Sequence, residues 1–416
     1  MARIGFGQKF CIWCVLEIFE FVVRSENETM SPPHSAFSKS FPAILHVDDG
    51  MHWRGGQQQV FYLLKGLTEK NIPTALVSPP GSMLGARSKE AGLCSIPLTM
   101  RGEMDFMAGF RIASLCKTRG FKILQAHTGH ALSLCLWAKL FYPPLQLIAV
   151  RRVDFHIGKN LLSRWKYTHP WIDRIVCLSR AIQEVLLADG IPKEKLVVIP
   201  SGIDLHRFDS VQVPNDFRKK WGIPEDHVLI GTVAAMAGHK DYPTFLSSAR
   251  MVLDRTDRVS FCVVGDGPEE KKVHQMAESL GLLPHIRFVG FRSDVEIFLK
   301  AFDIFVLSSK KEGLGTSLLD AQAVGIPVVA CASGGIPEIV IHEKNGLLVP
   351  SQNPLLLAEA ILRLVNDATL RKRLGQTGRI MVQAFDITHT VEKYIALYEE
   401  LGYSGENGER KRGNGK

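Results

Sequence analysis

Residues 308–330 read SSKKEGLGTSLLDAQAVGIPVVA, and this stretch decides the fold. It begins where the apolar strand predicted at Ile304–Leu307 ends. A glycine-rich loop, a helix, a tight turn at Gly325 and a second apolar strand then follow, an order typical of a parallel sheet covered by helices. Glycines let the backbone approach a ligand closely, and the N–H groups that begin a helix can bind an anion.

The same alternation of short apolar runs and amphipathic stretches continues along the chain from Phe41. Strands are predicted at 43–47, 74–77, 123–127, 147–150, 174–178 and 196–199, and again at 228–231, 259–264, 286–289, 304–307, 327–330 and 346–349. This pattern indicates an α/β protein with two Rossmann-like, doubly wound domains. A binding cleft is expected at the carboxyl ends of their strands.

The run Pro200–Asp204 and the irregular residues up to Pro214 interrupt the alternation and mark a domain boundary. The sequence thus predicts a poorly ordered extension (1–40), a first domain (41–214), a second domain (215–385), a helix that packs back toward the first domain (386–402) and a disordered tail (403–416).

The charge of the chain is concentrated in its first half. The 416 residues have a formal net charge of +8, and residues 1–215 carry all of it, with 25 Lys and Arg against 17 Asp and Glu. This favours an anionic partner, such as a phosphorylated substrate or an anionic lipid surface, although a solvated basic face would look the same. No motif that reads nucleic acid accompanies the charge, which argues against DNA or RNA binding.

No stretch reaches the roughly 18 apolar residues that a membrane span needs. The most apolar run, Phe10–Val23, is interrupted by Glu17 and Glu20. The spacing of Cys11 and Cys14 is that of a metal site, but no second pair or histidine cluster completes it. We therefore expect a cytoplasmic protein without a metal, and peripheral contact with the inner face of the membrane stays open.

Two carboxylates flank the glycine-rich loop. Glu312 precedes it, and Asp320 lies two turns into the helix. Carboxylates accept hydrogen bonds from vicinal hydroxyls, so the pair suits a sugar and a ribose. The structural alternative is that Glu312 caps the helix and that Asp320 faces solvent.

Residues 41–400 resemble the retaining glycosyltransferases of family 4 (glycosyl transferases group 1), which have the GT-B fold. This family includes bacterial phosphatidylinositol mannosyltransferases and lipopolysaccharide-core glycosyltransferases. Its Glu-x7-Glu element corresponds to Glu312-x7-Asp320. Four further motifs occur in the expected order: SGID at 201–204, VGDGP at 264–268, SGGIPE at 333–338 and NGLLV at 345–349.

The resemblance implies that a nucleotide-diphosphate sugar binds in a cleft between the two domains, with no metal and no other cofactor. It implies that Glu312 hydrogen-bonds the donor sugar, that His127 contacts the same sugar and that Lys240 binds the diphosphate. The other implied donor-binding residues are Gly55, Gly56, His239, Gly265, Gly313, Leu314, Gly315, Thr316 and Asp320, of which Asp320 would hold the ribose.

Two features depart from the family pattern. Asp320 is shorter by a methylene than the usual Glu, which we expect to alter or weaken the ribose contact. In residues 231–240, GTVAAMAGHK, alanines stand where the family has an arginine that grips the diphosphate together with Lys240. The loss of a guanidinium should be costly unless another group replaces it, and His239 is a partial substitute.

Candidate acceptor residues come from the first domain. Arg151 and Arg152 end a strand that faces the same cleft, where paired arginines suit a phosphate or carboxylate on the acceptor, or else an interdomain salt bridge. Residues 156–171 mix cations with Trp165 and Trp171. These aromatic residues could lie against an anionic membrane or cover the core of their own domain.

The predicted function is transfer of a sugar, with retention of configuration, to a phosphorylated or lipid-linked glycan acceptor such as a lipopolysaccharide precursor. Two alternatives remain: a nucleotide-sugar epimerase, which would act on the donor alone, and a non-catalytic sugar-nucleotide binder. An NAD-linked oxidoreductase is disfavoured, because no Gly-x-Gly-x-x-Gly follows the first strand.

Overall fold

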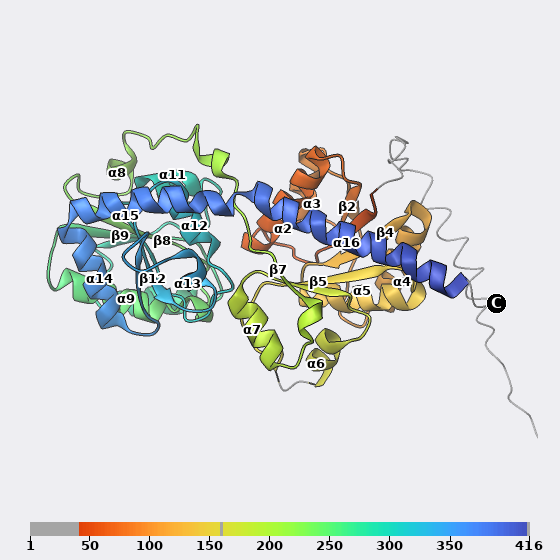
Figure 1. Cartoon of the computed structure of the whole chain (residues 1–416). Helices are drawn as coiled ribbons and strands as arrows, with labels where there is room; N and C mark the ends of the chain where they lie inside the picture. Colours follow the sequence, from red (N-terminus) through yellow and green to blue (C-terminus); the bar gives the residue numbers. More distant parts are fainter. Residues whose placement is uncertain (1–40, 159–160, 414–416) are drawn as a thin grey trace, which may run out of the picture. The chain divides into compact units, whose positions relative to one another are not determined.

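The computed structural model of the chain describes residues 41–158 and 161–413. The extension predicted at residues 1–40, with its Cys11 and Cys14, lies outside the described residues, as do residues 414–416. In the described part, parallel strands alternate with helices in two successive sheets (Figure 1). The predicted α/β class with two doubly wound halves is confirmed.

The first sheet has seven strands in the order β3-β2-β1-β4-β5-β6-β7. Its strands are β1 (Ala43–Val47), β2 (Thr74–Ser78), β3 (Ser95–Pro97), β4 (Phe121–Ala126), β5 (Gln146–Arg151), β6 (Arg174–Cys177) and β7 (Leu196–Val198). Its helices are α2 (Gly55–Glu69), α3 (Met83–Glu90), α4 (Phe106–Arg119), α5 (Gly129–Phe141), α6 (Leu161–Thr168), α7 (Arg180–Ala188) and the short η1 (Lys193–Lys195).

The second sheet has six strands in the order β10-β9-β8-β11-β12-β13. Its strands are β8 (Val228–Val233), β9 (Val259–Val264), β10 (Ile286–Phe288), β11 (Ile304–Leu307), β12 (Val328–Ala332) and β13 (Leu347–Pro350). Its helices are η3 (Gly238–Lys240), α9 (Tyr242–Leu253), α10 (Glu270–Ser279), α11 (Val295–Ala301), α12 (Thr316–Ala323), α13 (Ile336–Ile339), α14 (Pro354–Asn366) and α15 (Ala368–Met381).

Strand β11 illustrates why these strands appear in the sequence as unbroken apolar runs. Ile304 and Val306 belong to one buried cluster, whereas Phe305 and Leu307 belong to another. Successive side chains of a strand point to opposite faces, and both faces of this sheet are covered by helices, so every position is apolar.

Each of the two sheets has a switch point, where its strand order changes direction. The chain runs outward in opposite directions from the β1/β4 pair in the first sheet and from the β8/β11 pair in the second. Ligands of open α/β sheets bind outside the carboxyl ends of the strands at such a point. The loops after β1, β4, β8 and β11 are therefore the expected place for a site.

The chain crosses between the two sheets twice. It leaves the first sheet through η2 (Leu205–Phe208) and α8 (Phe217–Lys220), and it returns through η4 (Val382–Phe385) and α16 (Ile387–Gly413). The two crossings touch, because the Ile203 amide donates to the Phe385 carbonyl at 2.9 Å and the Ile387 amide donates to the Ile203 carbonyl at 2.9 Å.

Helix α16 packs on the first half of the chain, against α2 and β4 (Figure 1). Its side chains Val391, Tyr394, Leu397 and Tyr398 are buried in the same cluster as the strands of the first sheet. The Tyr398 hydroxyl donates to Oε1 of Gln125 on β4 at 2.7 Å. The helical backbone continues to Gly413, beyond residue 402, where this helix was predicted to end.

Candidate active site

An ion pair joins two of the predicted catalytic side chains at the carboxyl end of the second sheet. Lys240, which ends η3, pairs through Nζ with Oε2 of Glu312 in the loop after β11. The same oxygen accepts a hydrogen bond from Ser309 Oγ at 3.1 Å. The two charged side chains are 15% and 14% exposed, so water screens the pair little. Burial, followed by the charge of Lys240, lowers the pKa of the adjacent His239.

Glycines allow the loop before α12 to approach the first half closely. A Cβ atom on Gly313 would lie 2.1 Å from the carbonyl oxygen of Arg152, which follows β5. Gly315, with a φ of 92°, occupies the left-handed region at the N-cap of α12, and Leu314 between the two glycines is buried. A side chain at position 313 would push the loop away from Arg152, so the glycine is needed for this contact.

Gly55 and Gly56 are the first two residues of helix α2. A Cβ atom on Gly55 would lie 3.7 Å from Oγ1 of Thr316, the first residue of α12. The N-termini of two helices thus meet at the predicted donor site. The first N–H groups of a helix have no partner within it and carry partial positive charge, so the place where α2 and α12 meet favours an anion.

His127 follows β4 and lies in a buried chain of hydrogen bonds. Its Nε2 is 2.9 Å from Nδ1 of His46 on β1, and its Nδ1 is 3.2 Å from Nη2 of Arg152. A guanidinium can only donate, so His127 accepts at Nδ1 and donates its Nε2 proton to His46. Burial, and then the neighbouring His46 and Arg152, lower the pKa of His127. The ring is therefore neutral near pH 7, and both of its nitrogens have partners.

Asp320, the predicted ribose ligand, is paired with an arginine of the first crossing. Its Oδ2 lies 2.9 Å from Nη2 of Arg207 in η2, which also donates from Nη1 to the Tyr62 hydroxyl of α2 at 3.0 Å. The other oxygen of Asp320, Oδ1, is buried and lacks a hydrogen-bond partner among the described residues. Burial raises the pKa of Asp320. Asp320 is thus not the solvent-facing side chain of the structural alternative.

The two predicted acceptor arginines have different surroundings. Arg151 is buried, donates from Nη2 to the Phe155 carbonyl at 2.5 Å and lies 4.9 Å from the centre of the Tyr167 ring. Arg152 instead reaches His127 and Gly56. Within the described part of the chain neither arginine forms an ion pair with a carboxylate, so the alternative of an interdomain salt bridge is wrong for both.

The last predicted donor residue, Gly265, lies at the end of the neighbouring strand β9. Its φ is 134°, and a Cβ atom there would lie 2.3 Å from the carbonyl oxygen of Ala234. Gly265 therefore lets β9 approach the loop after β8, which carries Lys240. Its contact is with the alanine stretch rather than with the Lys240–Glu312 pair.

The structure brings most of the predicted residues into one connected set. Contacts link His127 to Arg152, Arg152 to Gly56 and Gly313, and the Gly313 loop to the Lys240–Glu312 pair. Three contributors were not predicted: Arg207, Tyr62 and His46. Arg207 is hidden in the irregular stretch that marks the boundary, whereas a histidine within an apolar strand was a signal for His46.

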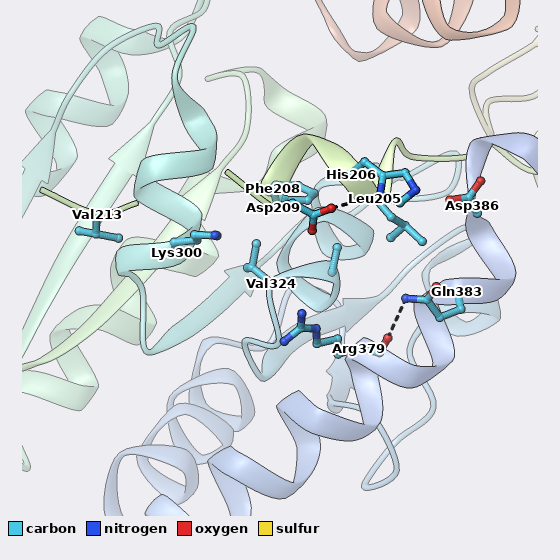
Figure 2. Close-up of a pocket in the computed structure, with 11 residues that line it drawn as sticks. Leu205, His206, Phe208, Asp209, Val213, Lys300, Val324, Arg379, Gln383 and Asp386 are labelled. Carbon is cyan, nitrogen blue, oxygen red and sulfur yellow. Dashed lines mark hydrogen bonds and ion pairs between the residues drawn. The ribbon is translucent and has the colours of Figure 1, made fainter. Parts of the chain in front are cut away.

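A pocket of about 560 Å³ lies beside the first crossing, away from this set. It is lined by Leu205, His206, Phe208, Asp209, Val213, Lys300, Ala323, Val324, Arg379, Gln383 and Asp386. Figure 2 shows Lys300 and Arg379 around it, together with Asp209 and Asp386. Its cations and carboxylates balance, and no predicted site residue lines it.

No group of three or more His, Cys, Asp or Glu side chains within 41–158 and 161–413 could hold a metal ion. In the same ranges, no helix is both long enough and apolar enough to cross a membrane.

Comparison with known proteins places the chain among glycosyltransferases. The model of the glycosyl transferases group 1 matches residues 214–381, and that of Glycosyltransferase Family 4 matches residues 53–207. A D-inositol 3-phosphate glycosyltransferase of Corynebacterium jeikeium is 28% identical over 83% of this chain and 82% of its own length. An Escherichia coli UDP-Gal:alpha-D-GlcNAc-diphosphoundecaprenol alpha-1,3-galactosyltransferase is 25% identical over 71% of this chain and 80% of its own.

Solved structures of glycosyltransferases share the fold. Alr3699/HepE of Anabaena, in complex with UDP and glucose, superposes with a TM-score of 0.76 at 19% identity, over 86% of this chain and all of that one. A glycosyltransferase from Rickettsia africae gives a TM-score of 0.76 at 20% identity, over 86% and 98% of the two chains.

The two doubly wound halves have the GT-B fold, and the family models and relatives identify the chain as a glycosyltransferase. More narrowly, the chain belongs to the family 4 glycosyltransferases, and its second half is their group 1 domain. The resemblance found in the sequence is confirmed. The roles of the individual site residues remain predictions.

Proposed function

We propose that the chain transfers a sugar from a nucleoside-diphosphate donor, with retention of configuration, to a lipid-linked or phosphate-bearing glycan acceptor. One observation carries the proposal: the N-termini of α2 and α12 meet beside the Lys240–Glu312 pair, since a Cβ atom on Gly55 would lie 3.7 Å from Oγ1 of Thr316. Two helix N-termini and a lysine suit a diphosphate, and a carboxylate suits the hydroxyls of the attached sugar.

The leaving group in this proposal is the nucleoside diphosphate. As the bond to the sugar breaks, negative charge grows on the diphosphate, and fixed donors aimed at it stabilise the transition state more than the ground state. Lys240 and the first N–H groups of α12 are such donors. This arrangement needs no metal. The proposal therefore includes the expectation that the enzyme works without a metal or another cofactor.

The proposed transfer keeps the configuration at the sugar carbon. Glu312 would orient the donor sugar, and His127 would contact it as a neutral ring. In the family that the sequence resembles, the acceptor attacks the face from which the phosphate leaves, and the departing phosphate takes the acceptor proton. Closure of the site would exclude water and prevent hydrolysis of the donor.

The acceptor class is suggested by the charge of the first half and by the relatives. Two relatives named above act on D-inositol 3-phosphate and on a diphosphoundecaprenol-linked sugar. Both acceptors carry phosphate, which agrees with a chain whose first 215 residues hold its entire net charge of +8. A cytoplasmic enzyme that works at the surface of the inner membrane would meet such acceptors.

Exposed aromatic side chains support a peripheral membrane contact. Trp165 and Trp171 are 50% and 37% exposed and both pack edge-on against His169. Tyr167 and Lys166 of the same segment are buried, so only part of it faces outward. Tryptophans beside basic residues favour the interface of an anionic membrane.

The proposal is tested with purified protein and a panel of UDP, GDP, ADP and CMP sugars in the presence of EDTA. A selective rise in melting temperature with one diphosphate sugar would name the donor. NMR of the product made with phospho-inositol or undecaprenyl-linked acceptors would then give its anomeric configuration. Conversion of the donor without an acceptor would indicate the epimerase instead, and binding without turnover would indicate the non-catalytic binder.

A further inference from the structure

Arg152 is a guanidinium with few partners. Of its five N–H donors, only one on Nη2 meets an acceptor in the described structure, namely Nδ1 of His127 at 3.2 Å. Its Nε is buried and has no hydrogen-bond partner among the described residues. No described carboxylate forms an ion pair with it. The buried carboxylate of Asp48 interacts with Arg152 electrostatically without a direct ion pair, so most N–H donors of the guanidinium stay available for a ligand.

The surroundings of Arg152 add positive potential. A Cβ atom on Gly56, in the first turn of α2, would lie 3.6 Å from Cδ of Arg152 and 3.9 Å from its Nε. The N-terminus of a helix carries about half a positive charge, which repels a guanidinium. Burial lowers the pKa of Arg152, although nearby Tyr394 and Asp48 oppose that shift. Two positive groups side by side are favoured only where an anion binds between them.

Gly56 has no side chain, so none stands between the first turn of α2 and Arg152. The small cavity on another side of the guanidinium, which Gln59, Ser201 and Tyr394 help to line, has a volume of only about 10 Å³. That is room for one water molecule at most, so the cavity explains no ligand. Gly55, the residue before Gly56, faces the start of α12, because a Cβ atom on it would lie 3.7 Å from Oγ1 of Thr316.

The second half lacks the arginine that the family uses to bind the donor diphosphate. Residues 231–240 contain alanines where the family has an arginine, and Lys240 is the cation that remains there beside the neutral His239. Arg152 reaches the second half through its own backbone, because its carbonyl oxygen lies against Gly313. The backbone of Arg152 is therefore held against the loop that precedes α12, while its guanidinium lies beside His127 and Gly56.

We propose that Arg152 supplies, from the first half, the guanidinium that binds the donor diphosphate, in place of the arginine absent from the loop after β8. The inference rests on the proposed function, because it needs a nucleoside-diphosphate donor. Arg152 then acts as the diphosphate ligand of the first half, and Lys240 as that of the second. Arg152 is thereby assigned to the donor and not to the acceptor.

Nucleotide binding measured by calorimetry tests the assignment, with UDP against UMP, GDP against GMP and ADP against AMP as probes. The readout is the ratio of the two dissociation constants, because general damage to the fold weakens both nucleotides and leaves the ratio unchanged. Arg152→Gln is expected to reduce the preference for the diphosphate by roughly tenfold to a hundredfold, the effect of losing a charge-assisted hydrogen bond. Arg152→Lys should give an intermediate ratio, since it keeps the charge and loses the fork.

Arg151→Gln is the matched control. Arg151 precedes Arg152 in the chain, and its guanidinium donates to the Phe155 carbonyl and stacks over the Tyr167 ring. It is expected to lower the melting temperature and to keep the diphosphate preference. A second variant moves the charge: Ala235→Arg, added to Arg152→Gln, should restore part of the lost preference, since Ala235 is partly exposed in the loop after β8.

The outcomes separate the two proposals. If the unmodified protein binds none of these nucleotides, the proposed function fails and the assignment of Arg152 fails with it. If the unmodified protein prefers the diphosphate and Arg152→Gln keeps that preference, only the assignment is overturned. An equal loss in the Arg151 and Arg152 variants would also overturn it, because the loop and not the guanidinium would then be responsible.

Discussion

The guanidinium of Arg207 lies 2.9 Å, from Nη2 to Oδ2, from the carboxylate of Asp320. Arg207 belongs to the segment that crosses between the two sheets, and it also binds the Tyr62 hydroxyl on α2. Asp320, the predicted ribose ligand, is thus linked through Arg207 both to the crossing segment and to α2 of the first half. A ribose that competes for the Asp320 carboxylate would therefore alter the contacts of this crossing segment.

Asp320→Asn is expected to lower the free energy of unfolding by about 3 kcal/mol, because it leaves a buried arginine without its closest anion. The side chains of Arg207 and Asp320 are only 11% and 14% exposed. Urea unfolding at pH 7 measures the loss. The matched control is Asp294→Asn, which breaks an Arg–Asp pair whose side chains are 32% and 38% exposed, and which should cost less than about 1 kcal/mol. Equal costs for the two variants would contradict a structural role for the Arg207 pair.

Glu312→Gln should lower turnover roughly tenfold to a hundredfold, because the amide no longer accepts two hydrogen bonds as a charged group. Glu312→Ala should do the same and, like Asp320→Asn, should also lower the free energy of unfolding, because it leaves the mostly buried Lys240 without its anion. The assay is product formation once the donor panel has named a substrate. Ser309→Ala removes only the hydroxyl that donates to Glu312 and serves as a mild control. Unchanged turnover in Glu312→Gln would remove Glu312 from the proposed site.

Stability should fall as the pH drops below about 6.5. Burial lowers the pKa of His46 from its ordinary value of 6.5 to about 3, so the unfolded chain binds a proton that the folded chain does not. The stabilisation is present above pH 6.5 and is lost progressively toward pH 3; for His46 alone the loss at pH 5 is about 2 kcal/mol. Urea unfolding at pH 7 and pH 5 gives the difference. His46→Phe should reduce this pH dependence of the unfolding free energy. The part of the pH dependence that comes from His127 should remain.

Gly313→Ala should separate the α12 loop from the first half. The added Cβ would lie 2.1 Å from the Arg152 carbonyl, a contact with backbone that cannot rotate away. We expect a loss of about 1–3 kcal/mol in unfolding free energy and a weaker response to the donor. Gly102→Ala is the control, since nothing lies within 4 Å of a Cβ there. If Gly313→Ala behaves like Gly102→Ala in thermal melts, the described contact between loop and strand end is wrong.

The joint variant Trp165→Ala, Trp171→Ala should bind anionic vesicles less well than the unmodified protein. The two indoles are exposed, so their removal changes little in the core. Co-sedimentation with vesicles of phosphatidylglycerol and phosphatidylcholine measures the effect, and pure phosphatidylcholine vesicles test for the charge contribution. Undiminished binding of the double variant would place the membrane contact elsewhere.

Strand positions were predictable because both sheets are buried on two sides. Predicted and observed bounds of the first strand, Ala43–Val47, agree, whereas β3 (Ser95–Pro97) was not predicted. Its three residues, Ser-Ile-Pro, form an edge strand with little apolar content, and such a strand has no sequence pattern of its own. The start of α2 at Gly55 was missed because paired glycines are typical of loops.

The sequence predicted which residues belong to the candidate site better than it predicted which of them contact one another. Lys240 and Glu312 were recognised by motif, but their ion pair follows from strand order, which a motif does not encode. Arg151 and Arg152 were taken together as facing one cleft. Arg151 ends β5 and Arg152 follows it, and their side chains diverge: Arg151 turns to Tyr167 and Arg152 to His127. Arg207 lies in a segment without periodicity, where the sequence offers no pattern to interpret.

The place of α16 has a consequence for the order in which the protein can fold during synthesis. Val391, Tyr394 and Tyr398 leave the ribosome after the entire second half, yet they belong to the core of the sheet that is made first. The core of that sheet stays incomplete, with part of its apolar surface uncovered, until the ribosome has nearly finished the chain. The second half therefore has the opportunity to fold first, and a chain that ends before α16 would leave the earlier half exposed to aggregation and proteolysis.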